Sequence, residues 1–184
     1  MEDEKKTPLY EKHLALGGRM INFGGWLLPV EYGGVGMAAE HKAVREKAGL
    51  FDVSHMGEII LKGPEALGLV QKLITNDAGK LEINQALYTA MCYPEGGVVD
   101  DLVVYKTEED CYLLVVNGAN IEKDYQWIME NKEGQVEVEN TSALLAQLAL
   151  QGPKSLSILQ KVTTYPVEEI KFYWCQPKVM VDGV

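Results

Sequence analysis

The sequence lacks the features that mark several common classes of protein. Its 184 residues include only three cysteines, which lie far apart and form no C-x-x-C pair, so neither a disulfide framework nor a zinc ribbon is indicated. No apolar run approaches the roughly 18 residues of a membrane span, and the charged amino terminus is unlike a signal peptide. We therefore expect a cytoplasmic protein with no membrane partner.

Basic residues are also scarce. Lys and Arg number 17 against 27 Asp and Glu, which gives a formal net charge of −10. Because a phosphate backbone attracts basic proteins, we expect no nucleic-acid partner. The three histidines, His13, His41 and His55, have no metal-ligand spacing among themselves or with cysteine, and the glycine pairs match no phosphate-binding fingerprint. We therefore expect no metal and no nucleotide cofactor.

What is present is a globular composition, with 47% hydrophobic and 24% charged residues. Residues 7–32 mix glycine pairs and prolines with short apolar pieces, which predicts an irregular arm with one helical turn. Beyond the arm, runs of β-prone residues alternate with amphipathic helical patterns, which predicts an α+β fold. The predicted helices are 37–50, 64–74, 120–132 and 153–162, and the predicted strands are 58–62, 86–93, 98–106, 111–116, 135–139, 146–150 and 178–182.

The end of the chain is informative because the predicted strand 178–182 stops at Gly183-Val184, where a turn should begin. We expect a chain that is cut in the middle of a hairpin. The alternative is a natural ending in a terminal edge strand.

Two adjacent acids, Asp100 and Asp101, lie inside an apolar strand. Because side chains alternate across a strand, the two must face opposite ways, and a buried carboxylate is costly unless it is hydrogen-bonded. One of them is therefore a candidate functional group. The alternative is that both lie at the end of the sheet and cap the hairpin.

Amide and aromatic side chains are further candidates for a binding site. Asn117 and Asn120 come after the strand 111–116. A side-chain amide at a strand end can both donate and accept hydrogen bonds, which recognition of the polar edge of a heterocyclic ligand requires. Asn120 is also the predicted N-cap of the next helix, whereas the role of Asn117 stays open. Five aromatic residues could line a slot or could simply be core: Trp26, Tyr88, Tyr93, Tyr105 and Tyr112.

Seven segments are distinctive when they are taken together and in order: TPLY at 7–10, NFGGW at 22–26, GLFDVSHMGE at 49–58, TND at 75–77, GGVVDDL at 96–102, VNGAN at 116–120 and LQGP at 150–153. In this combination, which spans nearly the whole chain, they resemble the amino-terminal half of the aminomethyltransferases, the T-proteins of the glycine cleavage system.

The resemblance implies an activity. Family members accept an aminomethyl group carried on the lipoyl arm of the H-protein, pass the one-carbon unit to tetrahydrofolate and release ammonia. It thus implies tetrahydrofolate as the one-carbon acceptor and the H-protein as a partner. Positioning and electrostatics matter more than covalent catalysis in such a transfer.

The resemblance also assigns site residues. Asp101 matches the family's catalytic, pterin-contacting carboxylate, which orients the folate and supports proton movement at the reacting nitrogen. Asn117 matches a pterin-contacting amide, Tyr88 and Met56 match residues that line the folate site, and Tyr173 matches a tyrosine near it.

The fold implied by the resemblance is two intertwined α+β lobes with antiparallel or mixed sheets. The first lobe, residues 1–50 plus 141–184, would be truncated, and the second would span 51–140. Family members continue with a glutamate segment, arginines that meet the folate tail and a β-barrel domain, so the transferase activity is expected of the full-length parent. Two alternatives are a non-catalytic folate-binding module and the folate domain of a demethylase-type relative.

Overall fold

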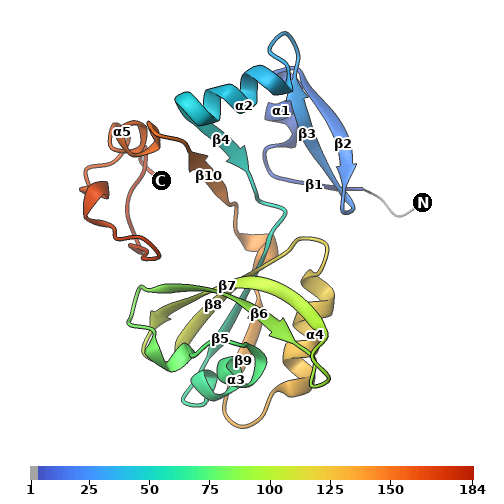
Figure 1. Cartoon of the computed structure of the whole chain (residues 1–184), viewed down its shortest axis with the longest axis vertical. Helices are drawn as coiled ribbons and strands as arrows, with labels where there is room; N and C mark the ends of the chain where they lie inside the picture. Colours follow the sequence, from blue (N-terminus) through green and yellow to red (C-terminus); the bar gives the residue numbers. More distant parts are fainter. Residues whose placement is uncertain (1–3) are drawn as a thin grey trace. The chain divides into compact units, whose positions relative to one another are not determined.

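The computed structural model describes residues 4–184, and Figure 1 shows strands and helices mixed along the chain. The chain forms two compact units. Unit 1 comprises the residues up to His55 together with Ala146–Glu169 and Val179–Val184, and unit 2 comprises Met56–Leu145 and Ile170–Lys178. Helices and strands occur in both units, so the predicted α+β class is confirmed.

Unit 1 contains two small sheets. The first has the order β1-β3-β2 and is mixed, because β1 runs parallel to β3 while β2 and β3 are antiparallel. The second pairs β10 with β4 in antiparallel fashion. The strands are β1 Lys5–Lys6, β2 Gly18–Phe23, β3 Trp26–Tyr32, β4 Gly49–Asp52 and β10 Leu148–Gln151, and the helices are α1 Tyr10–Ala15, α2 Met37–Glu46, α5 Ser155–Leu159 and the 3₁₀ turn η3 Val167–Glu169.

The prediction of an irregular arm over residues 7–32 is wrong except for its one helical turn, which corresponds to the short helix α1. Gly24 and Gly25 have φ of 57° and 87°, which is the positive-φ pair of a tight hairpin turn between β2 and β3. The glycines that suggested a break in structure are therefore the turn that joins two strands.

Two further predictions are corrected. The helix predicted over 37–50 ends at Glu46, because residues 49 and 50 pair with β10 instead. The strand predicted over 178–182 does not form: none of these residues is in a strand, and Lys178 and Asp182 lie in turns with φ of 60° and 49°. Positive φ is incompatible with an extended strand.

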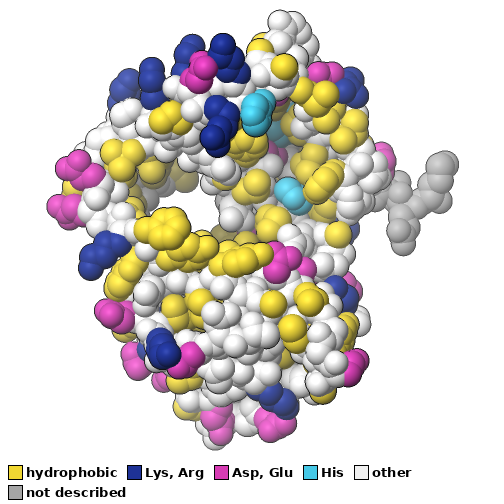
Figure 2. All heavy atoms as spheres, in the orientation of Figure 1, with side chains coloured by type: hydrophobic (Ala, Val, Ile, Leu, Met, Phe, Trp, Pro, Cys, Tyr) yellow, Lys and Arg dark blue, Asp and Glu magenta, His cyan; other side chains and the backbone are white. Residues whose placement is uncertain are grey.

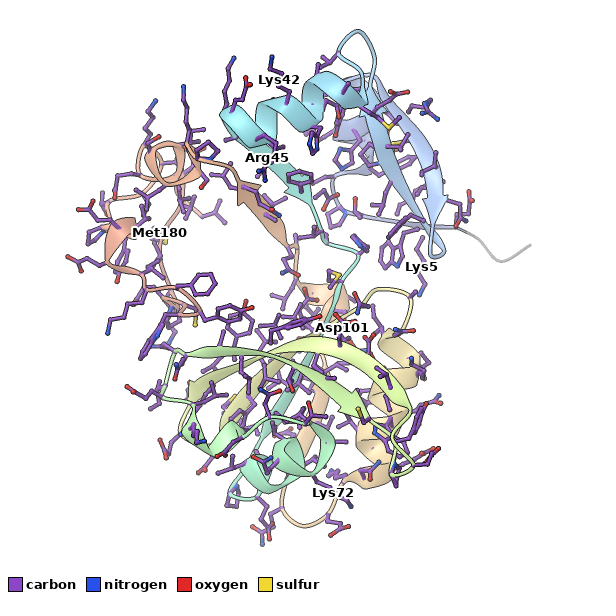
Figure 3. The ribbon with its side chains drawn as sticks, in the orientation of Figure 1. Lys5, Lys42, Arg45, Lys72, Asp101 and Met180 are labelled. Atoms are coloured by element: carbon purple, nitrogen blue, oxygen red, sulfur yellow. The ribbon has the colours of Figure 1, made fainter. Side chains whose placement is uncertain are left out.

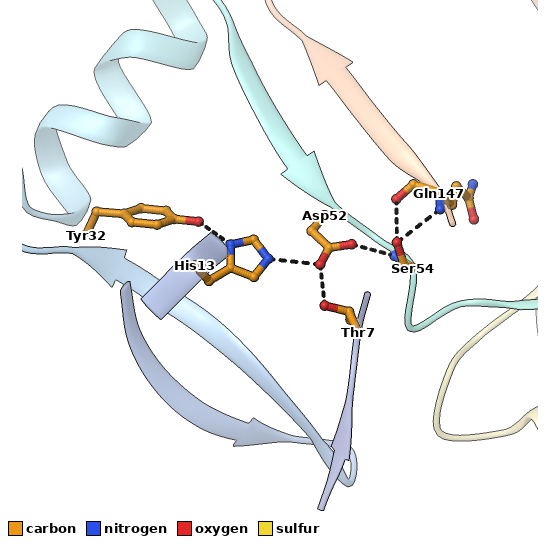
Figure 4. A network of polar contacts seen from close by, with 6 residues as sticks. All are labelled: Thr7, His13, Tyr32, Asp52, Ser54 and Gln147. Atoms are coloured by element: carbon orange, nitrogen blue, oxygen red, sulfur yellow. Dashed lines mark hydrogen bonds and ion pairs between the residues drawn. The ribbon is translucent and has the colours of Figure 1, made fainter. Parts of the chain in front are cut away.

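A buried carboxylate links the amino-terminal residues of unit 1 to β4, as Figure 4 shows. Asp52 accepts hydrogen bonds from Thr7 Oγ1 at 2.6 Å, His13 Nε2 at 2.9 Å and the Ser54 backbone N–H at 3.0 Å, while His13 Nδ1 lies 2.7 Å from Tyr32 Oη. Burial alone would raise the pKa of Asp52, but the hydrogen bonds, led by that of Ser54, lower it. This network is a structural centre of unit 1.

Unit 2 is built on one antiparallel sheet with the strand order β6-β7-β8-β5-β9. Its strands follow the predicted ranges closely, because the runs of β-prone residues are bounded by clear turn residues. The strands are β5 Gly57–Lys62, β6 Ala86–Cys92, β7 Val98–Glu108, β8 Cys111–Val116 and β9 Glu137–Asn140, and the helices are α3 Ala66–Leu73, α4 Ile121–Asn131 and the 3₁₀ turns η1 Ala78–Lys80 and η2 Ser142–Leu144.

The core of unit 2 lies on one face of this sheet. Helices α3 and α4 contribute Leu69, Val70, Leu73 and Ile128 to a buried cluster with Ile59, Leu61, Leu102, Val104, Leu114 and Val116 of the strands. The strand residues in this cluster alternate along their strands and share one face by register. The opposite face therefore carries the intervening residues.

A short segment of unit 2 comes from late in the chain. The Tyr173 carbonyl accepts a hydrogen bond from the Ala86 N–H at 2.7 Å, and the Cys175 N–H donates to the Asn84 carbonyl at 2.8 Å. Residues 170–178 thus pack beside the start of β6. The proposed division into lobes 1–50 plus 141–184 and 51–140 assigns this segment to the other lobe.

Apolar side chains also reach the surface, as the yellow areas of Figure 2 show. In unit 1 the exposed ones include Leu50 at 64% and Leu148 at 51%, which come from the paired strands β4 and β10. None of the helices in residues 4–184 combines the length and apolar character needed to cross a membrane.

Candidate functional site

The two adjacent acids of β7 lie on opposite faces of the sheet of unit 2. Asp100 is 4% exposed and shares the helix-covered face with Leu102 and Val104. Asp101 pairs with Ala90 and is exposed on the other face, where Figure 3 labels it. The strand therefore separates a buried carboxylate from an accessible one.

Asp101 is held by a tyrosine on the neighbouring strand. The Tyr88 hydroxyl donates to Asp101 Oδ2 at 2.7 Å. Since Tyr88 pairs with Val103, two residues beyond Asp101, this is a diagonal cross-strand contact. The hydrogen bond to Asp101, together with the negative charge of that carboxylate, raises the pKa of Tyr88.

Asn117 is the second contact of Asp101. It follows β8 directly, and the pairing of Val103 with Val115 places it opposite Asp101 by register. Its Nδ2 lies 3.3 Å from Asp101 Oδ1, 3.1 Å from the Asp101 carbonyl and 3.0 Å from Asp100 Oδ1. The side-chain amide thus bridges the two acids.

The remaining two predicted site residues lie in unit 2 but outside this hydrogen-bonded group. Met56 immediately precedes β5, and the pairing of Gly57 with Val116 puts it at the same sheet edge as Asn117. Tyr173, 41% exposed, lies at the start of β6, where its carbonyl meets Ala86. The structure therefore gathers Asp101, Tyr88 and Asn117 directly, with Met56 at the same edge and Tyr173 further along β6.

Asp100 accepts several hydrogen bonds on the helix-covered face of the sheet. It accepts from the Asn117 backbone N–H at 3.1 Å, from Asn117 Nδ2 and from Asn120 Nδ2 at 2.7 Å. Burial would raise the pKa of Asp100, but the polar groups around it, Asp124 first and then Asn117 and Asn120, lower it. Asn120 precedes α4 as predicted, yet its side chain forms no cap hydrogen bond, and its Nδ2 donates to Asp100 instead.

Sequence reasoning missed Asp124. This aspartate in α4 is fully buried, and burial, followed by the hydrogen bond with Asp100 and its charge, raises its pKa to about 8. A signal was available in the sequence: Asp124 follows Ile121 by three positions and precedes Ile128 by four, so helical periodicity puts it on the buried face.

Two hollows on the surface of unit 2 lie away from these residues. One of about 410 Å³ is bordered by Glu65, Lys72 and Glu133, and another of about 330 Å³ by Thr75, Tyr93 and neighbouring residues. None of the five predicted site residues lines either hollow. Within the described residues, no group of three or more His, Cys, Asp or Glu side chains is arranged to hold a metal ion.

Fold and site together define an α+β protein with an accessible strand aspartate that a tyrosine and an asparagine hold on an open sheet face. The family described as "GCVT N-terminal domain" matches residues 9–184, and the chain belongs to this family.

Named relatives agree with this assignment. The chain is 56% identical over 182 residues to the aminomethyltransferase of Moorella thermoacetica, covering 98% of this chain and 49% of the relative. It is 54% identical to that of Alkaliphilus metalliredigens, covering 100% and 50%.

A solved structure agrees as well. The crystal structure of glycine cleavage system aminomethyltransferase T from Bartonella henselae is similar with a TM-score of 0.84 and 32% identity, over 93% of this chain and 46% of that one. The chain thus spans about half the length of the relatives it matches.

Proposed function

We propose that these residues are the amino-terminal part of a tetrahydrofolate-dependent aminomethyltransferase of the glycine cleavage system. The parent protein would take the aminomethyl group from the lipoyl arm of the H-protein, transfer its one-carbon unit to tetrahydrofolate and release ammonia. The observation that carries the proposal is the hydrogen-bonded group of Asp101, Tyr88 and Asn117, in a chain 56% identical to an aminomethyltransferase over nearly its whole length.

Asp101 has the chemistry that a pterin edge requires. A pterin presents N–H donors beside a carbonyl acceptor, and a carboxylate can accept two of those donors at once. Asp101 is exposed, so its oxygens keep room for a ligand beyond their contacts with Tyr88 and Asn117. In the proposed reaction Asp101 orients the folate and supports proton movement at the reacting nitrogen.

The neighbours would shape the site around this carboxylate. Tyr88 fixes Asp101 and offers its ring as an apolar wall, and Asn117 uses its Nδ2 on the two acids. No donor to Asn117 Oδ1 occurs among the described side chains and backbone groups, so this oxygen can accept from a ligand N–H. Met56 and Tyr173 would complete the lining.

The partners and location belong to the same proposal. The H-protein would bring the aminomethyl group, and no nucleic acid, membrane or metal takes part. Three free cysteines are consistent with the reducing cytoplasm as the place of action.

The test is a calorimetric titration of the purified chain with tetrahydrofolate, beside a longer chain that includes the second half present in the relatives. Asp101→Asn is the site variant. Glu108→Gln is the matched control, because Glu108 is an exposed acid on the same strand with no contact to Tyr88 or Asn117. The H-protein-dependent formation of methylenetetrahydrofolate and ammonia is then measured with the longer chain.

We expect tetrahydrofolate to bind the longer chain, Asp101→Asn to weaken binding and turnover, and Glu108→Gln to change neither. Binding by the short chain as well would show that its residues hold enough of the pocket. If the longer chain binds tetrahydrofolate but forms no product with the H-protein, the protein is a folate-binding module and the transferase proposal is wrong.

A further inference from the structure

Asp124 presents a buried carboxyl group without an ordinary partner. It is 0% exposed on α4, and no N–H or O–H donor among residues 4–184 reaches either of its oxygens. Lys123 Nζ comes no nearer than 3.9 Å and donates to the Val99 carbonyl. An ionised carboxylate in such a place would be costly, so its remaining neighbour, Asp100, must account for it.

Asp100 and Asp124 differ sharply in their surroundings. Asp100 accepts three hydrogen bonds from N–H groups of Asn117 and Asn120, which stabilise its ionised form. Asp124 has no such donors. Asn120 brings the two together, because its carbonyl accepts the Asp124 N–H at 2.8 Å and its Nδ2 donates to Asp100 at 2.7 Å. Two neighbouring buried carboxyl groups cannot both ionise cheaply, so we place one proton on the pair, and it belongs on Asp124.

We propose that Asp124 is a positioning residue: as a neutral carboxylic acid it donates its O–H to Asp100, and Asp100 in turn fixes the amide of Asn117 beside Asp101. The pKa raised to about 8 for Asp124 and the lowered pKa of Asp100 agree with this assignment. The charged groups that act on Asp124 are Asp100 from β7 and Lys123 from its own helix.

The proposed hydrogen bond completes a chain of contacts from the helix to the site. In the proposal the Asp124 O–H donates to Asp100; Asp100 Oδ2 and Oδ1 accept from the backbone and side-chain N–H groups of Asn117, and Asn117 Nδ2 reaches Asp101. Loss of the donor on Asp124 would leave Asp100 short of one hydrogen bond in a buried place. Asp100 would then shift, and the Asn117 amide would lose its fixed orientation.

The first test needs no variant. In protein labelled with ¹³C in the aspartate carboxyl groups, we expect the Asp124 carbon to resonate as a protonated acid at pH 6, where an ordinary exposed aspartate is ionised. An Asp124 signal typical of a carboxylate at pH 6 would overturn the proposal.

The second test compares Asp124→Asn, whose amide can replace the O–H donor, with Asp124→Leu, which cannot donate. Ile128→Val, a small change at a buried position on the same helix, controls for general loss of packing. The readouts are the Asn117 side-chain amide signals in ¹H–¹⁵N spectra and the tetrahydrofolate dissociation constant of the longer chain.

We expect Asp124→Asn to keep the Asn117 signals and to hold the dissociation constant within about twofold, and Asp124→Leu to shift the signals and weaken binding about tenfold. Equal effects of Asp124→Leu and Ile128→Val, or equal damage from Asn and Leu at 124, would overturn the positioning role. The affinity readout rests on the proposed function; if the parent does not bind tetrahydrofolate, that function fails, while the carboxyl and amide signals still decide the role of Asp124.

Discussion

Glu58 provides the sharpest test of the electrostatics of unit 2. It lies in β5, is 5% exposed, and its Oε2 has no hydrogen-bond donor within the described part of the chain. Burial raises its pKa from 4.5 to about 7. Because the folded protein then holds a proton that the unfolded chain has released, the stability from this group is full below pH 4.5 and is lost as the pH rises through 7.

The size of the effect follows from the two pKa values. A shift of about 2.5 units corresponds to roughly 3 kcal/mol in total, and about 1.4 kcal/mol of it is lost between pH 6 and pH 9. Glu58→Gln cannot ionise, so its free energy of unfolding should fall by about 1.4 kcal/mol less than that of the parent over this range. The titration of Asp124 also lowers the free energy of unfolding as the pH rises, but it does so in both proteins and therefore cancels in the comparison.

The assay is urea unfolding at constant ionic strength at pH 6, 7, 8 and 9, followed by fluorescence, for which Trp127 in α4 is a reporter within unit 2. Glu139→Gln is the control, because Glu139 is an exposed acid that pairs with Ile60 on the adjacent strand. If the parent and Glu58→Gln lose the same free energy between pH 6 and pH 9, burial does not control the ionisation of Glu58 and the reasoning is refuted.

Three further predictions concern the site and its packing. Asp101→Asn should weaken tetrahydrofolate binding at least about tenfold in calorimetry, while its unfolding free energy stays within about 0.5 kcal/mol of the parent because the side chain is exposed; a larger loss of stability than of affinity would contradict the site. Tyr88→Phe removes the hydroxyl that holds Asp101, so the free energy of tetrahydrofolate binding should weaken by about 1 kcal/mol. An unchanged dissociation constant would show that this contact does not contribute to binding. Gly57→Ala should cost about 1–3 kcal/mol in urea unfolding, because the new Cβ would lie 2.6 Å from Ile121 Cγ1, whereas Gly68→Ala in open space on α3 should stabilise the helix.

The sequence predicted the strands of unit 2 well because their signals are local. Runs of β-prone residues between clear turn residues define β6, β7 and β8, and the alternation of side chains along a strand separates Asp100 from Asp101. The hairpin of β2 and β3 escaped prediction, because a Gly-Gly pair can equally mark a loop or a two-residue turn, and only the strand pairing decides.

Side-chain contacts between residues far apart in the sequence could not be predicted either, because they also depend on how the elements pair and pack. Asn120 lies at the N-cap position of α4, yet its side-chain amide donates to the carboxylate of Asp100, twenty residues earlier in the chain. Helical spacing alone could place Asp124 on the buried face, but its pairing with Asp100 depends on how α4 packs on the sheet. Local patterns thus gave the elements, and tertiary packing determined which polar groups meet.

The return of residues 170–178 to unit 2 has a consequence for synthesis on the ribosome. The five-stranded sheet has all its strands once Asn140 has emerged, but the contacts of Tyr173 and Cys175 beside β6 wait until the intervening piece of unit 1 has been made. Closing so long a loop is entropically unfavourable until both its ends are ordered. The nascent sheet therefore spends a period with the start of its edge strand uncovered, during which it is open to chaperones and to mispairing.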